Sequence, residues 1–340
     1  MNNTNTVCLE PFKNLSIEFR NNKPAISPCC IYPIFQAETV DFVNNTELIK
    51  IRQQWINGTP PTGCNSCTEM ESQGFPSRKQ MADDAWAAHN PPIQPGDVPT
   101  VELTSMDYWV GDICNLACIM CDPSNSSLWK QELGFVKDMK KSIINDSWKN
   151  LDLSHIENIH FWGGEPLLSK EHVEFLQALP NKSKIYLYYT TNGTVRPSAE
   201  LLEVWAKCDR VDIFCSLDDI GERYEYIRYP ADWQQTVENF RWMIDNCGAN
   251  VSFGINTTVN TLNQYYIEEI TDWFATNFKH DKLGRPIQHD LNPTIGPMSA
   301  ASTHDIVIEH LDRIDQRRGI NWRKVFPKAA EQIVPLTSAK

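Results

Sequence analysis

The chain has 340 residues, of which 41% are hydrophobic and 22% are charged, a composition typical of soluble globular proteins. This length can bury a large core, either in one domain with an appendage or in two domains. The formal net charge of −12 argues against a general nucleic-acid binder, because neutralising phosphates requires a basic face. No apolar run is long enough to cross a bilayer, and the first residues lack the basic and apolar segments of a secretory signal. We therefore expect a cytoplasmic protein without membrane association.

In chain order, the first 80 residues hold five cysteines, and the proline-containing stretch from His89 to Gly96 is typical of a linker. After the linker, short apolar runs typical of strands alternate with amphipathic runs typical of helices. The predicted strands are Val101–Met106, Ile156–Trp162, Ile185–Thr190, Val211–Leu217, Val251–Thr258 and Ile287–Thr294. The predicted helices are Leu128–Met139, Glu171–Leu179, Glu200–Ala206, Gln234–Asp245, Tyr265–Phe278 and Thr303–Gln316, the last with Val307, Leu311 and Ile314 on one face and an end near Gly319.

Regular alternation of strands and helices predicts an α/β fold with a parallel sheet. About six repeats are too few for the closed eight-stranded barrel, so we expect an open, partial (β/α)6 barrel with parallel strands. A small Cys-rich N-terminal module precedes this barrel. The predicted organisation is a Cys-rich module at 1–90, a core at 97–260, and a region at 261–340 that completes the barrel and contacts the substrate.

The 11 cysteines are odd in number and clustered along the chain. In a chain without a secretion signal, such clustering indicates metal ligation rather than disulfides, and it favours a reducing cytoplasm. Three further cysteines lie within the predicted core, and because buried free cysteine is common we interpret them as packing residues. They are Cys208, Cys215 and Cys247.

The most informative cluster is Cys114, Cys118 and Cys121, with the spacing C-x₃-C-x₂-C directly after the first predicted strand of the core. Three thiolates can hold three irons of a four-iron cluster, and no fourth cysteine follows in the same loop. One iron would therefore stay open to bind a cofactor or a substrate. Ligands of parallel sheets sit at the carboxyl ends of strands, where this loop lies.

A second motif, Gly163-Gly164-Glu165-Pro166, follows the next strand. The two glycines let the backbone approach a ligand closely. With the cysteine triad, this motif resembles the radical S-adenosylmethionine (radical SAM) superfamily. The resemblance implies a SAM-binding [4Fe-4S] cluster on the triad, with the amine and carboxylate of SAM on the open iron.

The resemblance continues at the later strand ends, from about Val101 to Val259. Ser216 and Asp218 lie two residues apart in a strand and therefore point to the same side. By resemblance, Met120 packs on the adenine and Arg228 pairs with the SAM carboxylate. The residues that the resemblance assigns to SAM are Met120, Gly163, Gly164, Glu165, Thr191, Asn192, Ser216, Asp218, Arg228, Asn256 and Val259.

The N-terminal cysteines provide enough thiolates for a second, complete site. They resemble the auxiliary-cluster modules of twitch or SPASM radical SAM proteins, which implies a second [4Fe-4S] cluster; structural zinc is the alternative. Which residue of the adjacent pair ligates stays open, with Cys30 marginally favoured. The candidate ligands are Cys8, Cys29, Cys30, Cys64 and Cys67.

The implied activity is reductive cleavage of SAM to a 5′-deoxyadenosyl radical, which abstracts hydrogen from a substrate in an oxygen-sensitive reaction. The first hypothesis for the substrate is a ribosomally made peptide or protein side chain, modified by epimerisation, crosslinking or oxidation. The alternatives are a small metabolite such as a sugar or nucleoside, or a non-catalytic iron–sulfur or zinc protein. A small electron donor such as flavodoxin or ferredoxin is the expected partner. His160 is expected to be a strand residue with a satisfied partner, and Trp162 is a candidate for shaping the substrate pocket.

Overall fold

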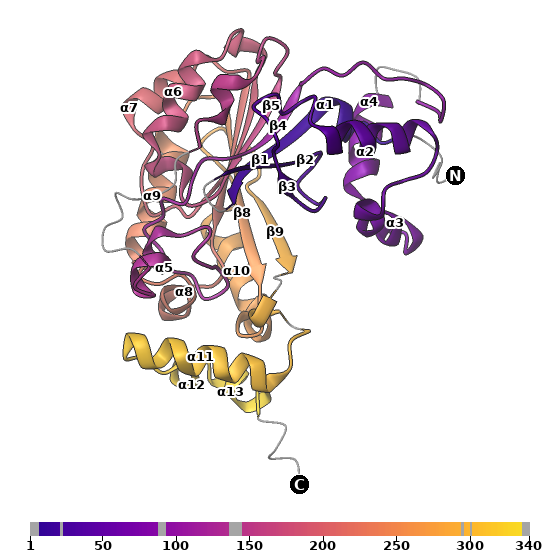
Figure 1. Ribbon diagram of the computed structural model, residues 1–340. Coiled ribbons are helices and arrows are strands. Elements are labelled where there is room, and N and C mark those ends of the chain that lie inside the picture. The colour runs from indigo at the N-terminus through magenta and orange to yellow at the C-terminus, as the bar shows by residue number, and fades with distance from the viewer. Residues whose placement is uncertain are drawn as a thin grey trace.

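The computed structural model describes residues 7–20, 23–87, 93–135, 145–293, 296–299 and 301–334. In these residues the strands form one nine-stranded sheet with the order β3-β2-β1-β4-β5-β6-β7-β8-β9 (Figure 1). From β4 to β9 each strand pairs in parallel with the next. The parallel strands are β4 (Ser105–Trp109), β5 (Asn158–Trp162), β6 (Tyr186–Thr191), β7 (Arg210–Ser216), β8 (Val251–Val259) and β9 (Gln288–Pro293).

Helices connect the parallel strands, and the sheet order follows the chain order. The first and last strands of the sheet do not pair with each other, so the sheet is an open, partial barrel as predicted. The connecting helices are α5 (Ser127–Glu132), α6 (Lys170–Ala178), α7 (Ala199–Trp205), α8 (Gly221–Ile227), α9 (Trp233–Asn246) and α10 (Ile267–Asn277).

The Cys-rich N-terminal segment continues the same sheet. Its strand β1 (Asn14–Arg20) pairs in parallel with β4, and β2 (Lys23–Ser27) and β3 (Phe35–Gln36) add antiparallel strands at the edge. The boundaries at 1–90, 97–260 and 261–340 stay a prediction. The N-terminal helices are α1 (Glu10–Lys13), α2 (Thr46–Ile56), α3 (Asn65–Ser72) and α4 (Arg78–Ala87).

Among the described residues, three α-helices follow β9 and lie together at the end of the molecule opposite α6 and α7 (Figure 1). They are α11 (His304–Arg318), α12 (Trp322–Val325) and α13 (Pro327–Gln332). The apolar face expected on α11 is confirmed, since Val307, Leu311 and Ile314 are all buried. Gly319 caps this helix with a φ of 66°, a left-handed conformation that glycine adopts without strain.

Two predicted elements have clearly different bounds in the structure. The strand predicted at Val101–Met106 begins at Ser105, because Glu102 and Thr104 donate their backbone amides to the carbonyls of Phe12 and Lys13 instead of a strand ladder. The helix predicted over Leu128–Met139 ends at Glu132, close to Gly134 with its φ of 74°. Its residues 136–139 lie outside the described part of the chain, as do residues 88–92 of the predicted linker. Within the described ranges, no helix is both long and apolar enough to span a membrane.

Candidate active site

A cavity of about 660 Å³ lies at the carboxyl ends of the parallel strands. It brings together segments that are far apart in the sequence, including the triad loop and the loops that follow β5, β6 and β7. The predicted site residues that line it are Cys114, Cys118, Met120, Cys121, Gly163, Gly164, Thr191, Asn192, Ser216 and Arg228.

The backbone of the triad loop is held by hydrogen bonds from several elements. From the start of α5, Ser126 Oγ donates to the Leu116 carbonyl at 2.6 Å. Trp129 Nε1 donates to the Cys118 carbonyl at 2.9 Å. Since buried carbonyls need partners, these contacts define the shape of the loop through the protein itself.

The Gly163-Gly164 pair packs backbone against backbone on the segment before the triad. Gly164 N donates to the Gly111 carbonyl at 2.8 Å, and Glu165 N donates to the Ile113 carbonyl at 2.6 Å. A Cβ atom on Gly164 would collide with the Ile113 carbonyl, and Gly163 has a φ of +127°. The glycines are therefore required for the close approach of two loops, a reason that the sequence alone does not reveal.

The carboxylate of Glu165 is buried and connects two strand ends. It accepts hydrogen bonds from Thr191 Oγ1 and from the Asn192 amide, each at 2.6 Å. Asn192 in turn donates its Nδ2 to Asn115 Oδ1 of the triad loop at 3.0 Å. Burial raises the pKa of Glu165, while the donated hydrogen bonds act in the opposite direction. Glu165 is not among the lining residues of the cavity, and in this structure its carboxylate orients the loop after β6.

Asp218 and Arg228 form an ion pair next to the triad. Arg228 Nε lies 2.7 Å from Asp218 Oδ2, and Arg228 Nη1 lies 3.9 Å from Cys118 Sγ. The other oxygen of Asp218 accepts the amide of Thr258 at 2.7 Å. Asp218 is fully buried and joins the ends of β7 and β8, whereas Arg228 reaches the cavity.

On β8, the lining residue is Thr258 rather than the predicted Asn256 or Val259. The Asn256 side chain instead lies near β9, where its Oδ1 is 3.5 Å from Asn292 Nδ2. The roles of Asn256 and Val259 in binding adenine stay predictions.

A buried carboxylate and an imidazole form part of the same site, and sequence reasoning did not find this arrangement. Asp107 and His160 are register partners on β4 and β5, with Asp107 Oδ1 3.3 Å from His160 Nδ1. His160 Nε2 lies 3.4 Å from Thr190 Oγ1, and His160 and Thr190 both line the cavity. Burial alone would raise the pKa of Asp107, but the hydrogen bond with His160 and the charge of Arg78 outweigh it and lower this pKa. The satisfied partner expected for His160 is present; Trp162 also lines the cavity.

A second, small cavity gathers the N-terminal cysteines. Cys8, Cys29, Cys64 and Cys67 line it, together with residues such as Glu10 and Arg78. Cys30 does not line this cavity and instead lines the 660 Å³ cavity with the triad. The two adjacent cysteines therefore face different sites, and the local geometry favours Cys29 over the marginally preferred Cys30 as a partner of Cys8, Cys64 and Cys67.

Both thiol sets consist of donors that can hold an iron–sulfur cluster or zinc. Among the described residues, no three His, Cys, Asp or Glu side chains converge closely enough to hold one metal ion. In a four-iron cluster each thiolate binds a different iron, so its ligands surround the group instead of converging. Burial raises the pKa of the triad thiols, that of Cys121 to about 12, and binding of iron would release their protons.

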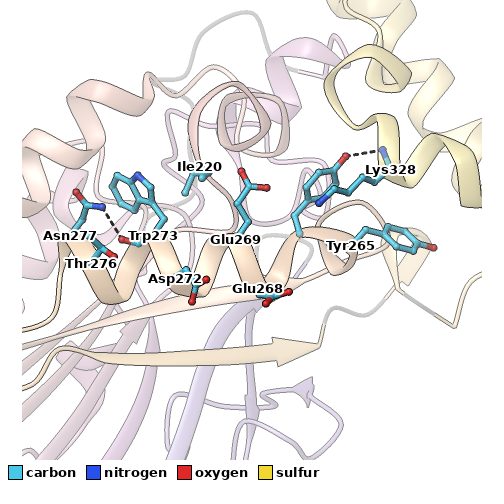
Figure 2. A pocket seen from close by; sticks show the side chains of 10 residues that line it. Ile220, Tyr265, Glu268, Glu269, Asp272, Trp273, Thr276, Asn277 and Lys328 are labelled. Atoms are coloured by element: carbon cyan, nitrogen blue, oxygen red, sulfur yellow. Dashed lines mark hydrogen bonds between the residues drawn. The ribbon is translucent and has the colours of Figure 1, made fainter.

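A further cavity, of about 590 Å³, lies along α10 on another part of the molecule. Figure 2 shows Glu268, Glu269 and Asp272 along this helix, with Trp273 at one end and Lys328 at the other. It contains none of the predicted site residues. The other three cysteines, Cys208, Cys215 and Cys247, are buried, as packing residues should be.

Residues 109–274 match the family model described as the Radical SAM superfamily. This match runs from the end of β4 into α10 and includes the three-cysteine loop that lines the cavity at the strand ends of the open parallel barrel. The chain therefore contains a radical SAM domain, and the members of that superfamily use a [4Fe-4S] cluster and SAM.

Two curated relatives share part of this sequence. A probable GTP 3′,8-cyclase of Methanocella arvoryzae is 28% identical over 177 residues, which cover 50% of this chain and 50% of the relative. A GTP 3′,8-cyclase of Alkaliphilus oremlandii is 28% identical over 180 residues, which cover 52% of this chain and 53% of the relative. The similarity thus spans about half the length of these relatives.

Solved structures with a similar arrangement include SuiB of Streptococcus suis bound to S-adenosylmethionine. It is 12% identical with a TM-score of 0.39, and the match covers 90% of this chain and 69% of SuiB. Another is anSMEcpe with bound AdoMet, which is 18% identical with a TM-score of 0.39, over 64% of this chain and 63% of that protein.

Proposed function

We propose that this radical SAM enzyme abstracts hydrogen from a ribosomally made peptide or a protein side chain. The observation that carries the proposal is the single cavity that joins the cysteine triad, the glycine loop, Asn192, Ser216 and Arg228. In this proposal the triad holds a [4Fe-4S] cluster, and the residues of the glycine loop and the strand ends hold SAM. When bound, these groups supply one electron for cleavage of the SAM sulfonium and a carbon-centred radical that abstracts hydrogen.

The residues of the chain bind and orient these groups. The buried guanidinium of Arg228, fixed by Asp218, presents positive charge beside Cys118 and at the cavity. A cation in this position favours an anionic cluster and attracts a carboxylate. Met120, which lines the same cavity, offers an apolar and polarisable surface for a base.

His160 provides a proton-handling group for the substrate. Its Nδ1 faces the buried carboxylate of Asp107, so the carboxylate favours the tautomer with the proton on Nδ1, in which Nε2 is an acceptor facing Thr190. The tautomer follows from the hydrogen-bond partners, because an ionised carboxylate can only accept. With 33% of its side chain exposed, His160 is accessible from the cavity. Such a group suits a reaction in which the substrate loses a proton as well as a hydrogen atom.

The N-terminal cysteines are proposed to hold an auxiliary [4Fe-4S] cluster through Cys8, Cys29, Cys64 and Cys67. Their shared cavity supports this ligand set, and burial raises the pKa of Cys29 to about 12 and that of Cys64 to about 11. Four protein thiolates would saturate the cluster, so electron relay suits it better than direct substrate binding.

A small metabolite is the second candidate substrate, and the observation that favours it is the partial similarity to proteins named GTP 3′,8-cyclase. The lining of the cavity favours the peptide. Of the described lining residues, Arg228 is the only arginine or lysine, and a single cation with an ion-pair partner in Asp218 cannot balance a triphosphate. A triphosphate needs several cationic partners, and the carboxylates of Glu18 and Asp122 on the same wall disfavour it further. A peptide backbone can instead hydrogen-bond with lining residues such as Ser16, Ser27 and Tyr32.

We further propose that a small electron donor such as flavodoxin or ferredoxin serves the enzyme in a reducing cytoplasm. The test of the proposed function is anaerobic reconstitution with iron and sulfide, followed by dithionite and SAM. We expect about eight irons per chain and formation of 5′-deoxyadenosine, the iron figure being that of two four-iron clusters. Zinc instead of iron, or a spectroscopically verified cluster without 5′-deoxyadenosine, would refute it. Adding candidate peptides, and in parallel sugars or nucleosides, then shows which class increases turnover and changes mass.

A further inference from the structure

We propose that His310 and Arg318 of the C-terminal helix α11 are positioning residues that set the reduction potential and the SAM affinity of the triad cluster. This inference rests on the proposed function of the triad as a cluster site. Neither residue carries a recognisable sequence motif, and neither lines the 660 Å³ cavity. Both lie on α11, which begins more than 180 residues after the triad and passes below α5 and α8 in Figure 1.

The two side chains bind the carbonyl groups of the residues that flank the second cysteine, Cys118. His310 Nε2 lies 2.8 Å from the Ile119 carbonyl, and since a carbonyl only accepts, Nε2 is the donor. Arg318 Nη2 donates to the Ala117 carbonyl at 2.7 Å. Cys118 is therefore fixed from both neighbours by one helix.

The opposite side of the same loop is held by the last residue of α8 and by the segment that follows it. Ala117 N donates to the Tyr229 carbonyl at 2.6 Å, and Ile119 N donates to the Ile227 carbonyl at 2.9 Å. Each of the two residues that flank Cys118 thus uses its N–H on one side and its C=O on the other. Loss of the α11 contacts would leave two buried carbonyls without these partners and would let Cys118 change direction.

Arg318 is itself held rigidly and is almost completely buried. Its side chain is 2% exposed, and both Nε and Nη2 lie 3.1 Å from the carboxylate of Glu132. The guanidinium also lies 4.9 Å from the centre of the Trp129 ring and 4.3 Å from that of Tyr229. Its Nη1 is buried and has no hydrogen-bond partner in the described residues. An anionic group nearby would stabilise such a buried donor.

These contacts have an electrostatic consequence for the triad. The reduction potential of an iron–sulfur cluster depends on nearby charge, on hydrogen bonding and on solvent exposure. The Arg318 cation stabilises the extra negative charge of the reduced cluster, and its hydrogen bond to the loop also favours the reduced state. Replacing Arg318 with a neutral residue would also leave the carboxylate of Glu132 uncompensated, which makes reduction harder still.

The experiment uses the reconstituted full chain with SAM and dithionite, and needs no substrate. Arg318→Met removes the positive charge, and Arg318→Lys keeps the charge but lacks the planar guanidinium group. The double variant, Arg318→Met with Glu132→Gln, removes both charges of the pair. His310→Leu removes the donor to Ile119, and His310→Gln keeps an amide donor of similar reach. Arg313→Met is the matched control, because Arg313 lies on α11 with 62% of its side chain exposed and pairs with Glu309.

The readouts are the midpoint potential and the electron paramagnetic resonance spectrum of the reduced cluster, together with KM for SAM and kcat for 5′-deoxyadenosine. For Arg318→Met we expect about a tenfold lower ratio of reduced to oxidised cluster at a fixed potential, equal to about 59 mV for one electron. Arg318→Lys and the double variant should recover part of this shift. His310→Leu should change the spectrum and raise KM for SAM severalfold, His310→Gln should restore both, and Arg313→Met should change neither.

Thermal stability and iron content of each variant separate positioning from simple stabilisation. A purely structural helix would lower the melting temperature of Arg318→Met and His310→Leu but leave the potential, the spectrum and KM unchanged, and this result overturns the inference. If Arg318→Met does not fold, the unchanged potential of Arg318→Lys and the double variant would overturn it equally. Failure of the proposed function is distinct, because the unmodified chain would then form no cluster or no 5′-deoxyadenosine.

Discussion

The two cysteine sites of this molecule are built in opposite ways. The triad comes from one eight-residue loop, from Cys114 to Cys121, whose backbone is bound by α5, α11 and the segment after α8. The N-terminal site collects thiols from a residue before α1, a residue after β2, and the turn that begins α3. Its two most distant members, Cys8 and Cys67, are almost sixty residues apart.

This difference separates two ways of making a cluster site. Hydrogen bonds from other parts of the protein hold the backbone of the triad loop, so we expect the loop to keep its conformation when iron is removed. At the N-terminal site the thiols come from three separate segments, so a bound group would add a link between them, beside contacts such as the Arg78–Glu10 ion pair. The predictions that follow test this contrast, beginning with the largest effect.

Loss of a triad thiol should abolish activity, whereas loss of an N-terminal thiol should not. Cys118→Ala removes one of three ligands from the site that binds SAM, so formation of 5′-deoxyadenosine should fall to background. Cys64→Ala removes a ligand of the other site and should leave SAM cleavage within about threefold of the unmodified chain. Both rates are measured by chromatography after anaerobic reconstitution. Equal loss in both variants would contradict the separation of the two sites.

The adjacent cysteines should differ in their effect on iron content. Cys29 lines the N-terminal cavity and Cys30 lines the triad cavity, so Cys29→Ser should lower iron by about half and Cys30→Ser should not. Iron is counted per chain after reconstitution, and SAM cleavage is measured on the same samples. The reverse order, with Cys30→Ser losing the iron, would restore the choice marginally favoured from the sequence.

Substituting Gly164 should damage the triad side alone. A Cβ atom there collides with the Ile113 carbonyl, and we expect Gly164→Ala to lower the free energy of unfolding by about 3 kcal/mol and to raise KM for SAM. Gly134→Ala is the control, since its Cβ meets nothing within 4 Å and only its φ of +74° is unfavourable, which costs about 1 kcal/mol. Chemical denaturation and SAM titration measure both effects. A Gly164→Ala variant no worse than the control would show that this loop can move away from the triad.

The contrast between the sites also explains what the sequence could predict. The triad spacing and the Gly-Gly-Glu-Pro motif are local patterns, and the alternation of strands and helices predicted the open parallel barrel. These features depend on residues close together in the chain, and the resemblance to the superfamily followed from them. The pairing of β1 with β4 was not predicted, because a non-local strand contact leaves no local pattern.

The missed site residues share the same cause. His160 was interpreted only as a satisfied strand residue, because the register that places it opposite Asp107 is set by the pairing of β4 and β5. A polar residue at an inward position of each strand was the available signal. The contacts of His310 and Arg318 with the triad loop come from a helix at the other end of the chain, and no spacing rule reaches that far.

Protonation of a buried histidine should lower the folding stability of the triad side of the molecule at acidic pH. His172 on α6 is fully enclosed, with Nδ1 2.9 Å from the Ser169 carbonyl and Nε2 3.1 Å from the hydroxyl of Tyr189. Burial lowers the pKa of His172 to about 4 from an ordinary value of 6.5. The unfolded chain therefore binds this proton more tightly than the folded chain, and the stability present above pH 6.5 is lost as the pH falls toward 4.

The shift corresponds to a loss of about 3 kcal/mol between these two pH values. His172→Gln, which keeps hydrogen-bonding capacity without the charge, should flatten this part of the stability profile, measured by denaturation at pH 4.5, 5.5 and 7, values chosen roughly to bracket the transition. His155→Gln is the control, because 59% of that side chain is exposed, and it should leave the slope unchanged.

Tyr189 lies on β6, which ends at Thr191 and is followed by Asn192. Since both of these residues line the triad cavity, acid should loosen the cavity through the contact of His172 with Tyr189. If the free energy of unfolding of His172→Gln depends on pH as steeply as that of the unmodified chain, other buried groups cause the acid sensitivity and His172 does not.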